Sequence, residues 1–313
     1  MNPEISIIIP TYNRAEWLPS TLASIQNQTF SRWECIIVDD LSTDQTIELV
    51  TKIAENDSRI KVYKRPLDKI KGPNSCRNYG FEKCTGAFVY FFDSDDLLKS
   101  DALEKYLYAF KEDVDVVVAP VNKTKYRTGE ILSVSKIQSQ QLIFDYFKGD
   151  VSFYICGPFW RKAFLLKQSE LFDEELRNLD DFDFNLRMLY SRPKISYLQE
   201  PLVNYQQHES SLKQELKKLN VPEIKSAFAA REKHYQLIKT NSITPLEPIQ
   251  NLIISFRKEL LRLALIEKHD RSFDFYQAVV SEQLKFGKYV GIIRTSFAYL
   301  LYKLTGKGYR FLK

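Results

Sequence analysis

Short apolar runs that alternate with amphipathic segments constrain the fold of this chain more than any other feature. Two runs, SIIIP at residues 6–10 and CIIV at residues 35–38, are almost wholly apolar, as is typical of strands that helices cover on both faces. The alternation predicts an α/β fold with a doubly wound, mostly parallel sheet and helices on both of its faces. The expected strands are Ile5–Ile9, Glu34–Val38, Ile60–Tyr63, Ala87–Phe92 and Val114–Val118, and the expected helices between them are Trp17–Gln26, Thr43–Glu55, Ser75–Cys84 and Ser100–Lys111.

Polar side chains follow three of these strands at the point where each strand ends. Pro10-Thr11-Tyr12-Asn13-Arg14 follows the first strand, Asp39-Asp40 the second and Asp93-Ser94-Asp95-Asp96 the fourth. Ligands of doubly wound sheets bind outside the carboxyl ends of the strands, where chain ends and helix N-termini converge. The three clusters are therefore expected to meet at one edge of the sheet, which predicts a binding site there.

The third cluster, in the run FFDSDD at residues 91–96, has the chemistry of a metal site. Carboxylates close together after a buried strand supply the hard oxygen ligands that Mg²⁺ and Mn²⁺ prefer, and a diphosphate completes such a site. A metal there would neutralise charge on a departing nucleoside diphosphate. The alternative is an ordinary helix start, with Ser94 or Asp95 as N-cap and Asp96 favoured by the helix dipole.

Beyond residue 120 the pattern loosens. It predicts a hairpin around Thr128-Gly129, a helix over Gln138–Phe147, a helix over Phe182–Tyr190 that opens with the acidic residues Asp180, Asp181 and Asp183, and a strand over Ile195–Tyr205 that leads to His208. From Ser211 onward only helical periodicity remains, with breaks at Thr244-Pro245 and His269-Asp270. We therefore expect a catalytic domain at 1–211 and a helical C-terminal region at 212–313.

Composition excludes several classes of protein. The four cysteines are scattered without a CxxC pair, so we expect reduced thiols and a cytosolic protein without a zinc site. The net charge of +5 is mild, and no nucleic-acid partner is expected. We expect no signal peptide, because the chain opens almost at once with an apolar strand, and no membrane span, because no stretch reaches roughly 18 apolar residues. A dinucleotide enzyme would need a G-x-G-x-x-G run, which the chain lacks.

Residues 5–110 resemble bacterial family 2 glycosyltransferases, which have the GT-A fold. The segments that carry the resemblance are SIIIPTYNR (6–14), SIQNQTF (24–30), CIIVDDLSTDQT (35–46), GPNSCRNYG (72–80) and GAFVYFFDSDDLL (86–98). A weaker resemblance continues through 172–189 and 204–212, and it does not extend to the last hundred residues. The resemblance implies an enzyme that takes a sugar from a nucleotide-diphosphate sugar, most often a UDP-sugar, with Mn²⁺ or Mg²⁺ as cofactor.

The resemblance also implies roles for individual residues. A base and ribose pocket would be lined by Pro10, Thr11, Tyr12 and Asn13, with Asp40 hydrogen-bonded to the base. Arg77 would lie near the donor diphosphate, Asp95 and Asp96 would hold ribose and metal with Asp93 close by, and His208 would lie near the metal and diphosphate. Asp181 matches the carboxylate that activates the acceptor, although many relatives have Glu-Asp where this chain has Asp180-Asp181, so the choice between these neighbours stays open.

A single acceptor-activating carboxylate fits an inverting displacement, which needs no second carboxylate as nucleophile. Because the QxxRW motif of processive relatives is missing, we expect one sugar to be added per encounter. The family suggests a glycan or lipid-linked glycan as acceptor, in the synthesis of capsule, O-antigen or a similar envelope polymer. The alternative from another class is a non-catalytic nucleotide-sugar-binding or scaffolding protein.

The C-terminal segment has a composition of its own. After Glu282 there is no acidic residue, while Lys285, Lys288, Arg294, Lys303, Lys307, Arg310 and Lys313 accumulate among apolar and aromatic residues. Such a helix suits the surface of an anionic membrane, which predicts peripheral attachment at the inner face of the cell membrane. Packing of the same apolar face against the catalytic domain, with the lysines solvated, is the alternative.

Overall fold

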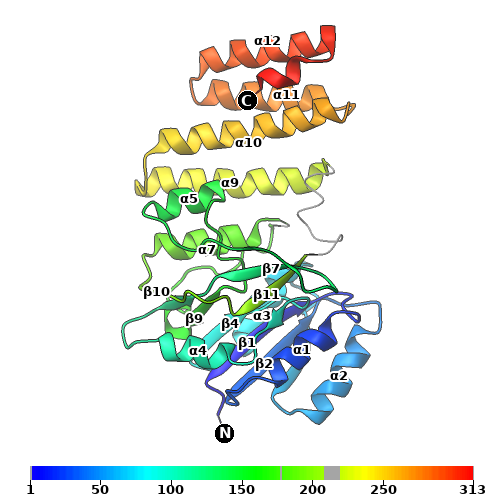
Figure 1. The fold of residues 1–313 in the computed structure, drawn as a ribbon, viewed down its shortest axis with the longest axis vertical. Helices are drawn as coiled ribbons and strands as arrows, with labels where there is room; N and C mark the ends of the chain where they lie inside the picture. Colours follow the sequence, from blue (N-terminus) through cyan, green and yellow to red (C-terminus); the bar gives the residue numbers. More distant parts are fainter. Residues whose placement is uncertain (1, 177, 208–218, 313) are drawn as a thin grey trace. The chain divides into compact units, whose positions relative to one another are not determined.

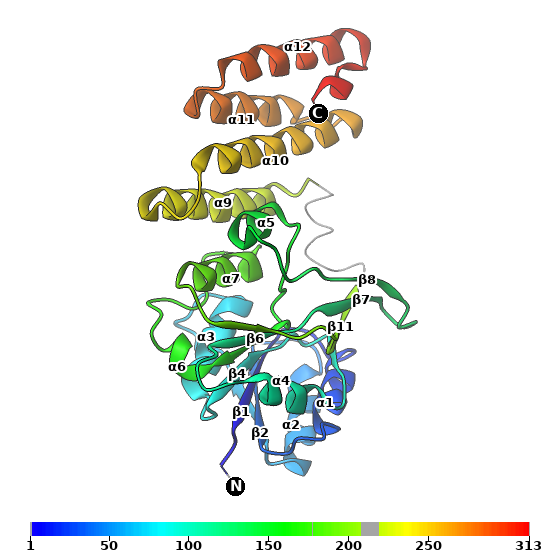
Figure 2. The ribbon, with the colours of Figure 1, turned by 60° about the vertical axis from the view of Figure 1, so that its left-hand side comes forward.

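The computed structural model describes residues 2–176, 178–207 and 219–312. Residues Met1–Leu212 and Lys213–Lys313 form two compact units. His208, one of the predicted site residues, lies outside the described residues. Figures 1 and 2 show strands and surrounding helices in the first unit and only helices in the second.

The first unit is built on a seven-stranded sheet with the order β10-β6-β9-β4-β1-β2-β3. The four adjacent strands β4, β1, β2 and β3 run parallel to one another, and β10 runs parallel to β6. Strand β9 runs antiparallel to both of its neighbours, β4 and β6. The predicted mostly parallel α/β sheet is therefore confirmed. Its strands are β1 (Ile5–Thr11), β2 (Trp33–Asp39), β3 (Ile60–Lys64), β4 (Phe88–Phe91), β6 (Val116–Val118), β9 (Pro158–Arg161) and β10 (Ile195–Tyr197).

Buried β-branched residues explain the centre of this sheet. Every residue of β1 and β2 is buried, as expected of strands covered on both faces. Helix α3 (Pro73–Lys83) packs on β1 and β2. A Cβ at Gly80 would lie 2.4 Å from the Cγ2 of Ile8, so glycine permits this close approach of helix and strand.

The other helices of this unit are α1 (Leu18–Gln26), α2 (Thr46–Asn56), α4 (Ala102–Ala109), α5 (Leu142–Lys148), α6 (Lys162–Leu165) and α7 (Asp180–Tyr190). Figure 1 places α1 and α2 beside the blue strands β1 and β2. Aromatic rings fill the core around the antiparallel strand, where Tyr106 and Phe159 stack with their centroids 4.9 Å apart. All four cysteines are buried and form no disulfide.

A second sheet of four strands, in the order β5-β11-β7-β8, was not predicted. It contains β5 (Leu97–Leu98), β7 (Val121–Lys125), β8 (Ile131–Val134) and β11 (Val203–Gln207). The hairpin predicted around Thr128-Gly129 is confirmed, because β7 and β8 pair antiparallel and Gly129 adopts a φ of 67°.

The single strand predicted over Ile195–Tyr205 is wrong. The segment divides into β10 in the large sheet and β11 in the small one. Pro201 lies between them, and proline lacks the N–H that a continuous strand needs for its ladder.

The second unit consists of α9 (Val221–Asn241), α10 (Leu246–Ile266), α11 (Ser272–Lys285), α12 (Tyr289–Thr305) and a short 3₁₀ helix, η1 (Gly308–Phe311). Its interior contains an apolar cluster that includes Leu261, Val279 and Ala298, and a partly buried ion pair joins Arg257 Nε to Glu282 Oε2 at 2.6 Å. None of the helices in the described part of the chain has the length and hydropathy needed to cross a bilayer.

Candidate functional site

The turn after β1 is fastened to the loop after β2 by side chains of both. The two strands end in register, with Thr11 opposite Asp39. The backbone N–H of Asn13 donates to Ser42 Oγ at 2.9 Å, and the Asn13 amide oxygen accepts the N–H of Thr43 at 2.8 Å. Asn13 adopts a φ of 52°, a left-handed conformation that asparagine tolerates better than most residues. The predicted pocket residue is therefore fixed in place before any ligand binds.

The other predicted pocket residues differ in their exposure. Pro10 and Thr11 are buried at the end of β1, and no hydrogen-bond partner for Thr11 Oγ1 is found in the described part of the chain. Tyr12 is 38% exposed, and Lys71 Nζ lies 4.0 Å from its ring centroid. The exposed ring is the group of this turn that a nucleotide base could stack on.

A buried ion pair holds the end of β2. The Asp40 carboxylate accepts a hydrogen bond from Arg65 Nε, and both side chains are buried. Arg65 also donates through NH1 to the backbone oxygens of Pro66 and Lys69, so it shapes the loop after β3. The predicted base-binding carboxylate is thus already partnered by an arginine that the sequence analysis missed, although Arg65 directly follows a strand, as the recognised clusters do.

The acidic run after β4 lies at the same edge of the sheet. Asp93 Oδ1 accepts a hydrogen bond from Arg77 at 2.8 Å, and Arg14 Nε lies 3.8 Å from Asp95 Oδ2. Asp96 is buried, and its Oδ1 accepts the backbone N–H of Gln206 at 3.0 Å. Gln206 also donates through its side chain to the Asp95 carbonyl at 2.5 Å, so β11 anchors the whole run.

Crowding of these carboxylates perturbs their protonation. Burial raises the pKa of Asp93 to about 6. The charge of Arg77 lowers this pKa, whereas the charge of Asp95 raises it. Burial, followed by the charges of Asp95 and Asp93, raises the pKa of Asp96 well above its usual value. Asp93, Asp95 and Asp96 therefore lie close enough to affect one another's charge, and a group of carboxylates of this kind attracts a cation.

Arg77 joins this acidic run to a second one that lies far away in the sequence. Its guanidinium is 5% exposed and donates to Asp93, to Asn74 Oδ1 at 3.1 Å and to Asp180 Oδ2 at 2.5 Å. Burial alone would lower the pKa of Arg77, but Asp180 and Asp93 outweigh burial and raise it. The structure therefore brings Asp93 and Asp180 to opposite sides of one cation.

The second acidic run begins helix α7. Leu179 precedes it with a φ of 62°, and its N–H is bound by the side-chain oxygen of Asn178 at 2.8 Å. Asp181 is half-buried, and its Oδ1 accepts the following backbone N–H at 2.8 Å. Asp183, by contrast, is buried and forms an ion pair with Arg187 at 2.7 Å. Of the three aspartates, Asp183 is thus a structural residue of the helix.

Tyr205 of β11 is close enough to both acidic runs to be affected by their charges. Burial, followed by the charges of Asp96, Asp93 and Asp181, raises its pKa. The ring of Tyr154 lies 4.9 Å from it, centroid to centroid. The sequence analysis assigned no role to Tyr205, although this residue ends the strand that it expected over Ile195–Tyr205.

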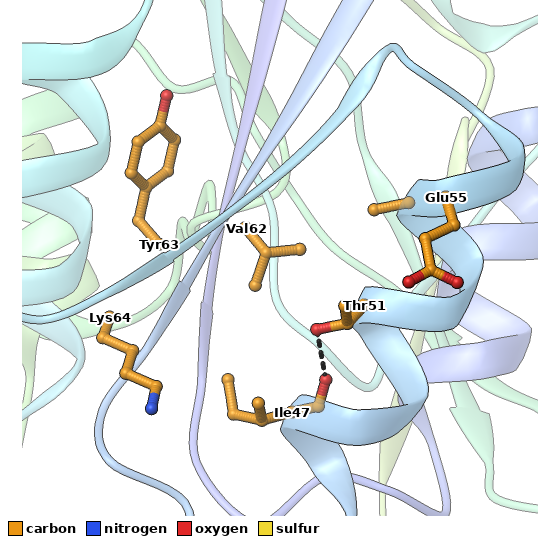
Figure 3. A pocket seen from close by; sticks show the side chains of 7 residues that line it. Ile47, Thr51, Glu55, Val62, Tyr63 and Lys64 are labelled. Carbon is orange, nitrogen blue, oxygen red and sulfur yellow. Dashed lines mark hydrogen bonds between the residues drawn. The ribbon is translucent and has the colours of Figure 1, made fainter.

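A groove of about 440 Å³ lies elsewhere, between α2 and β3 (Figure 3). Its lining residues are Ile47, Thr51, Ala54, Glu55, Val62, Tyr63 and Lys64. None of them is a predicted site residue, and the Thr51 hydroxyl donates to the Ile47 carbonyl of its own helix at 2.8 Å. We therefore assign the candidate site to the carboxyl edge of the sheet and not to this groove.

Comparison with known proteins identifies the family of this chain. The model of the family described as "Glycosyl transferase family 2" matches residues 6–169. The protein EpsH of Bacillus subtilis is 27% identical over 266 residues, which cover 82% of this chain and 73% of EpsH. A GalNAc(5)-diNAcBac-PP-undecaprenol beta-1,3-glucosyltransferase of Campylobacter jejuni is 40% identical over 110 residues, but these make up only 35% of each protein.

Solved structures share the fold. Residues 1–349 of TarS from S. aureus, crystallised with UDP-GlcNAc, superpose with a TM-score of 0.57 at 22% identity, with 92% of each chain covered. The mannosyltransferase PcManGT of Pyrobaculum calidifontis, solved with GDP-Man and Mn²⁺, gives a TM-score of 0.50 at 14% identity, over 98% of this chain and 88% of the other. At these identities the two structures support the GT-A-like fold.

Proposed function

Because the chain belongs to glycosyl transferase family 2, we propose that it transfers one sugar per encounter, with inversion, from a nucleotide-diphosphate sugar to an acceptor hydroxyl. The observation that carries this proposal is the meeting of two acidic runs, one after β4 and one at the start of α7, on either side of Arg77. A transferase of this kind needs a donor side that manages diphosphate charge and an acceptor side with a base.

Asp181 is the proposed base. Asp180 is bound by Arg77 and Asp183 by Arg187, so both carboxylates serve as anchors of the site. Asp181 is half-buried, so an acceptor hydroxyl has access to it, and it is the position to which the family resemblance assigns activation of the acceptor. We propose that Asp181 takes the proton of that hydroxyl while the oxygen attacks the sugar and the nucleoside diphosphate leaves.

The acidic run after β4 fits a divalent cation. No group of three or more His, Cys, Asp or Glu residues arranged to hold a metal is found in residues 2–176, 178–207 and 219–312. Mg²⁺, however, is commonly held by one or two carboxylates with substrate phosphates completing its shell. Asp95 and Asp96 would be those ligands, and Asp96 Oδ2 is buried without a hydrogen bond to the described residues. When bound, Mn²⁺ or Mg²⁺ neutralises the charge on the leaving diphosphate.

The donor pocket would lie over the turn of Pro10, Thr11, Tyr12 and Asn13. The exposed Tyr12 ring offers a face to a base, and the ion pair of Asp40 with Arg65 would supply the polar side of the pocket. A UDP-sugar is the proposed donor, which agrees with the UDP-GlcNAc bound to TarS. Arg77 and His208 are predicted to lie near the diphosphate. For His208 this prediction is based on the sequence resemblance alone.

A glycan or lipid-linked glycan is the proposed acceptor, in bacterial envelope polysaccharide synthesis in the cytoplasm. The Campylobacter relative has an undecaprenol-linked glycan in its name, and a Bacillus subtilis relative, TuaG, 40% identical over 105 residues, is named for teichuronic acid biosynthesis. Both likenesses cover about a third of this chain, so they support the class of acceptor and not its identity.

The test is a donor screen with matched variants. Purified protein, Mn²⁺, polyprenyl-diphosphate glycan acceptors and a panel of nucleotide sugars are combined, and the released nucleotide is measured. We expect Asp181→Asn to lower kcat by about 10²-fold or more, and to leave the calorimetric Kd for the donor within about threefold. Glu175→Gln, at an exposed carboxylate six residues upstream, is the control and should retain wild-type turnover.

Two results would overturn the proposal. Failure of every donor to release nucleotide, despite measurable donor binding, would make the protein a non-catalytic nucleotide-sugar-binding protein. Preserved turnover with a large loss of donor affinity in Asp181→Asn would make Asp181 a ligand-positioning residue.

A further inference from the structure

Helix α12 presents two separate apolar faces. One face packs into the second unit, where Thr295, Ala298 and Tyr299 are buried and Ala298 and Tyr299 join the cluster that contains Leu261 and Val279. This face accounts for the stability of the helix within its unit. A helix in a globular protein normally needs no other apolar face.

The second face is a stripe of large apolar side chains that are exposed. Its members are between 59% and 76% exposed: Tyr289, Val290, Ile293, Phe297, Leu300 and Leu304. Their spacing of mostly three or four residues places them along one side of the helix. We call this set the α12 stripe. Scattered apolar residues on a surface need no explanation, but a continuous row of this kind marks an interaction surface.

Positive charge lines the α12 stripe on both sides. Because successive residues are about 100° apart around a helix, Arg294 lies to one side of Ile293 and Lys303 lies to the other side of Leu304. Lys307 and Arg310 follow in the terminal turn. Neither Arg294, Lys303, Lys307 nor Arg310 has a carboxylate partner among the described residues, whereas Lys285 and Lys288 are paired with Glu232 and Glu247.

The positive charge beside the α12 stripe also affects a lysine on helix α10. Burial and the charge of Arg294 together lower the pKa of Lys258 on α10. No acidic residue follows Glu282 in the sequence. An occupant of the α12 stripe must therefore be apolar along its centre and anionic at its edges.

We propose that the α12 stripe is a membrane-docking surface, on which the protein binds the face of an anionic lipid bilayer. The apolar side chains enter the boundary between headgroups and acyl chains, and Arg294 and Lys303 contact lipid phosphates. A second copy of the chain is the weaker occupant, because pairing two stripes would bring uncompensated Arg294 and Lys303 side chains together. This inference requires no sugar transfer and can be tested without donor or acceptor.

The experiment is sedimentation of the full-length protein with two kinds of vesicle. One kind contains equal parts of phosphatidylglycerol and phosphatidylcholine, and the other contains phosphatidylcholine alone. The stripe variant carries Ile293→Ser and Phe297→Ser, and the charge variant carries Arg294→Gln and Lys303→Gln. The control carries Tyr108→Ser and Lys111→Gln in the first unit, where Tyr108 is 92% exposed.

We expect the wild type and the control to bind the anionic vesicles, and to release them as salt is raised. The charge variant should bind about 25-fold more weakly, since each of the two cations contributes about a factor of five. The stripe variant should lose more than about 10-fold in partitioning. Circular dichroism checks that both variants keep the helical content of the wild type.

Three results would overturn the proposal. The first is wild-type protein that stays in the supernatant with both vesicle types. The second is a stripe variant that binds as the wild type does. The third is concentration-dependent self-association of the wild type that the stripe variant abolishes without lipid, which would make the stripe an interface between copies.

Discussion

Replacement of Arg77 by methionine tests whether this arginine holds the two acidic runs together. Methionine keeps much of the side-chain volume but removes the charge and the donors. The substitution would leave Asp93 and Asp180 facing each other without the cation that now binds both, at 2.8 Å and 2.5 Å. The loss is therefore mainly electrostatic and not a loss of packing.

The magnitude follows from burial. Removing one partner of a buried ion pair destabilises a protein by about 3–5 kcal/mol, because the other charge stays behind. Here the Asp93 and Asp180 side chains are 26% and 18% exposed, so water partly compensates them, and we expect the low end, about 3 kcal/mol. For a unit of this size that corresponds to a fall in Tm of about 6–12 °C.

Thermal unfolding followed by near-ultraviolet circular dichroism measures the effect. Arg127→Met is the matched control, because Arg127 pairs with Glu16 at 3.2 Å but is 77% exposed, and exposed pairs contribute about 1 kcal/mol or less. The double variant Arg77→Met/Asp180→Asn should recover part of the loss, since it removes one of the two stranded charges. A Tm for Arg77→Met within about 2 °C of wild type would refute the view that Arg77 is a structural cation of the site.

Two further predictions concern individual carboxylates. Asp96→Asn keeps an acceptor for the Gln206 N–H but removes a proposed metal ligand. We therefore expect Mn²⁺-dependent nucleotide release to fall about 10²-fold with an unchanged circular dichroism spectrum. If the activity of this variant depended on Mn²⁺ concentration as that of the wild type does, the metal would be removed from the proposal. Burial alone would raise the pKa of Glu34, but hydrogen bonds from Lys61, Ser6 and Thr85 lower it to about 2. The stability that this carboxylate contributes is therefore present above its usual pKa near 4.5 and is lost as the pH falls through about 2. Glu34→Gln should lower the free energy of unfolding by about 2 kcal/mol at pH 7. In urea titrations, the difference in this free energy between variant and wild type should shrink between pH 4.5 and 2. A difference that does not change with pH would contradict this account.

The sequence predicted the parts of the fold that local patterns encode. Strands such as β1 and β2 are buried apolar runs that end in polar residues, and both properties are visible residue by residue. Strand β9 and the second sheet were missed because short strands such as Leu97–Leu98 and Pro158–Arg161 have too few residues to show a period. Their pairing depends on partners far away in the chain.

The candidate site shows the same division. Asp40 and Asp96 were singled out because acidic residues after buried strands are conspicuous, yet their partners were not. Asp40 is paired with Arg65, and Asp96 is held by the backbone of Gln206. Such contacts depend on which side chain the fold brings opposite a carboxylate, and no spacing in the sequence records it.

Backbone conformation gives independent support for the site at the carboxyl edge of the sheet. Among the non-glycine residues with positive φ, Arg192, Ser242 and Lys268 follow helix ends, where a left-handed residue is usual. Leu41 and Leu179, both at a φ of 62°, follow no helix end. Leu41 comes directly after Asp39-Asp40, and Leu179 directly before Asp180-Asp181. A leucine in this region costs about 1–2 kcal/mol, and such strain persists only where the surrounding contacts enforce it. The strained backbone at these two leucines therefore lies next to the acidic residues in the chain. Backbone strain and the polar residues at strand ends thus indicate the same edge of the sheet.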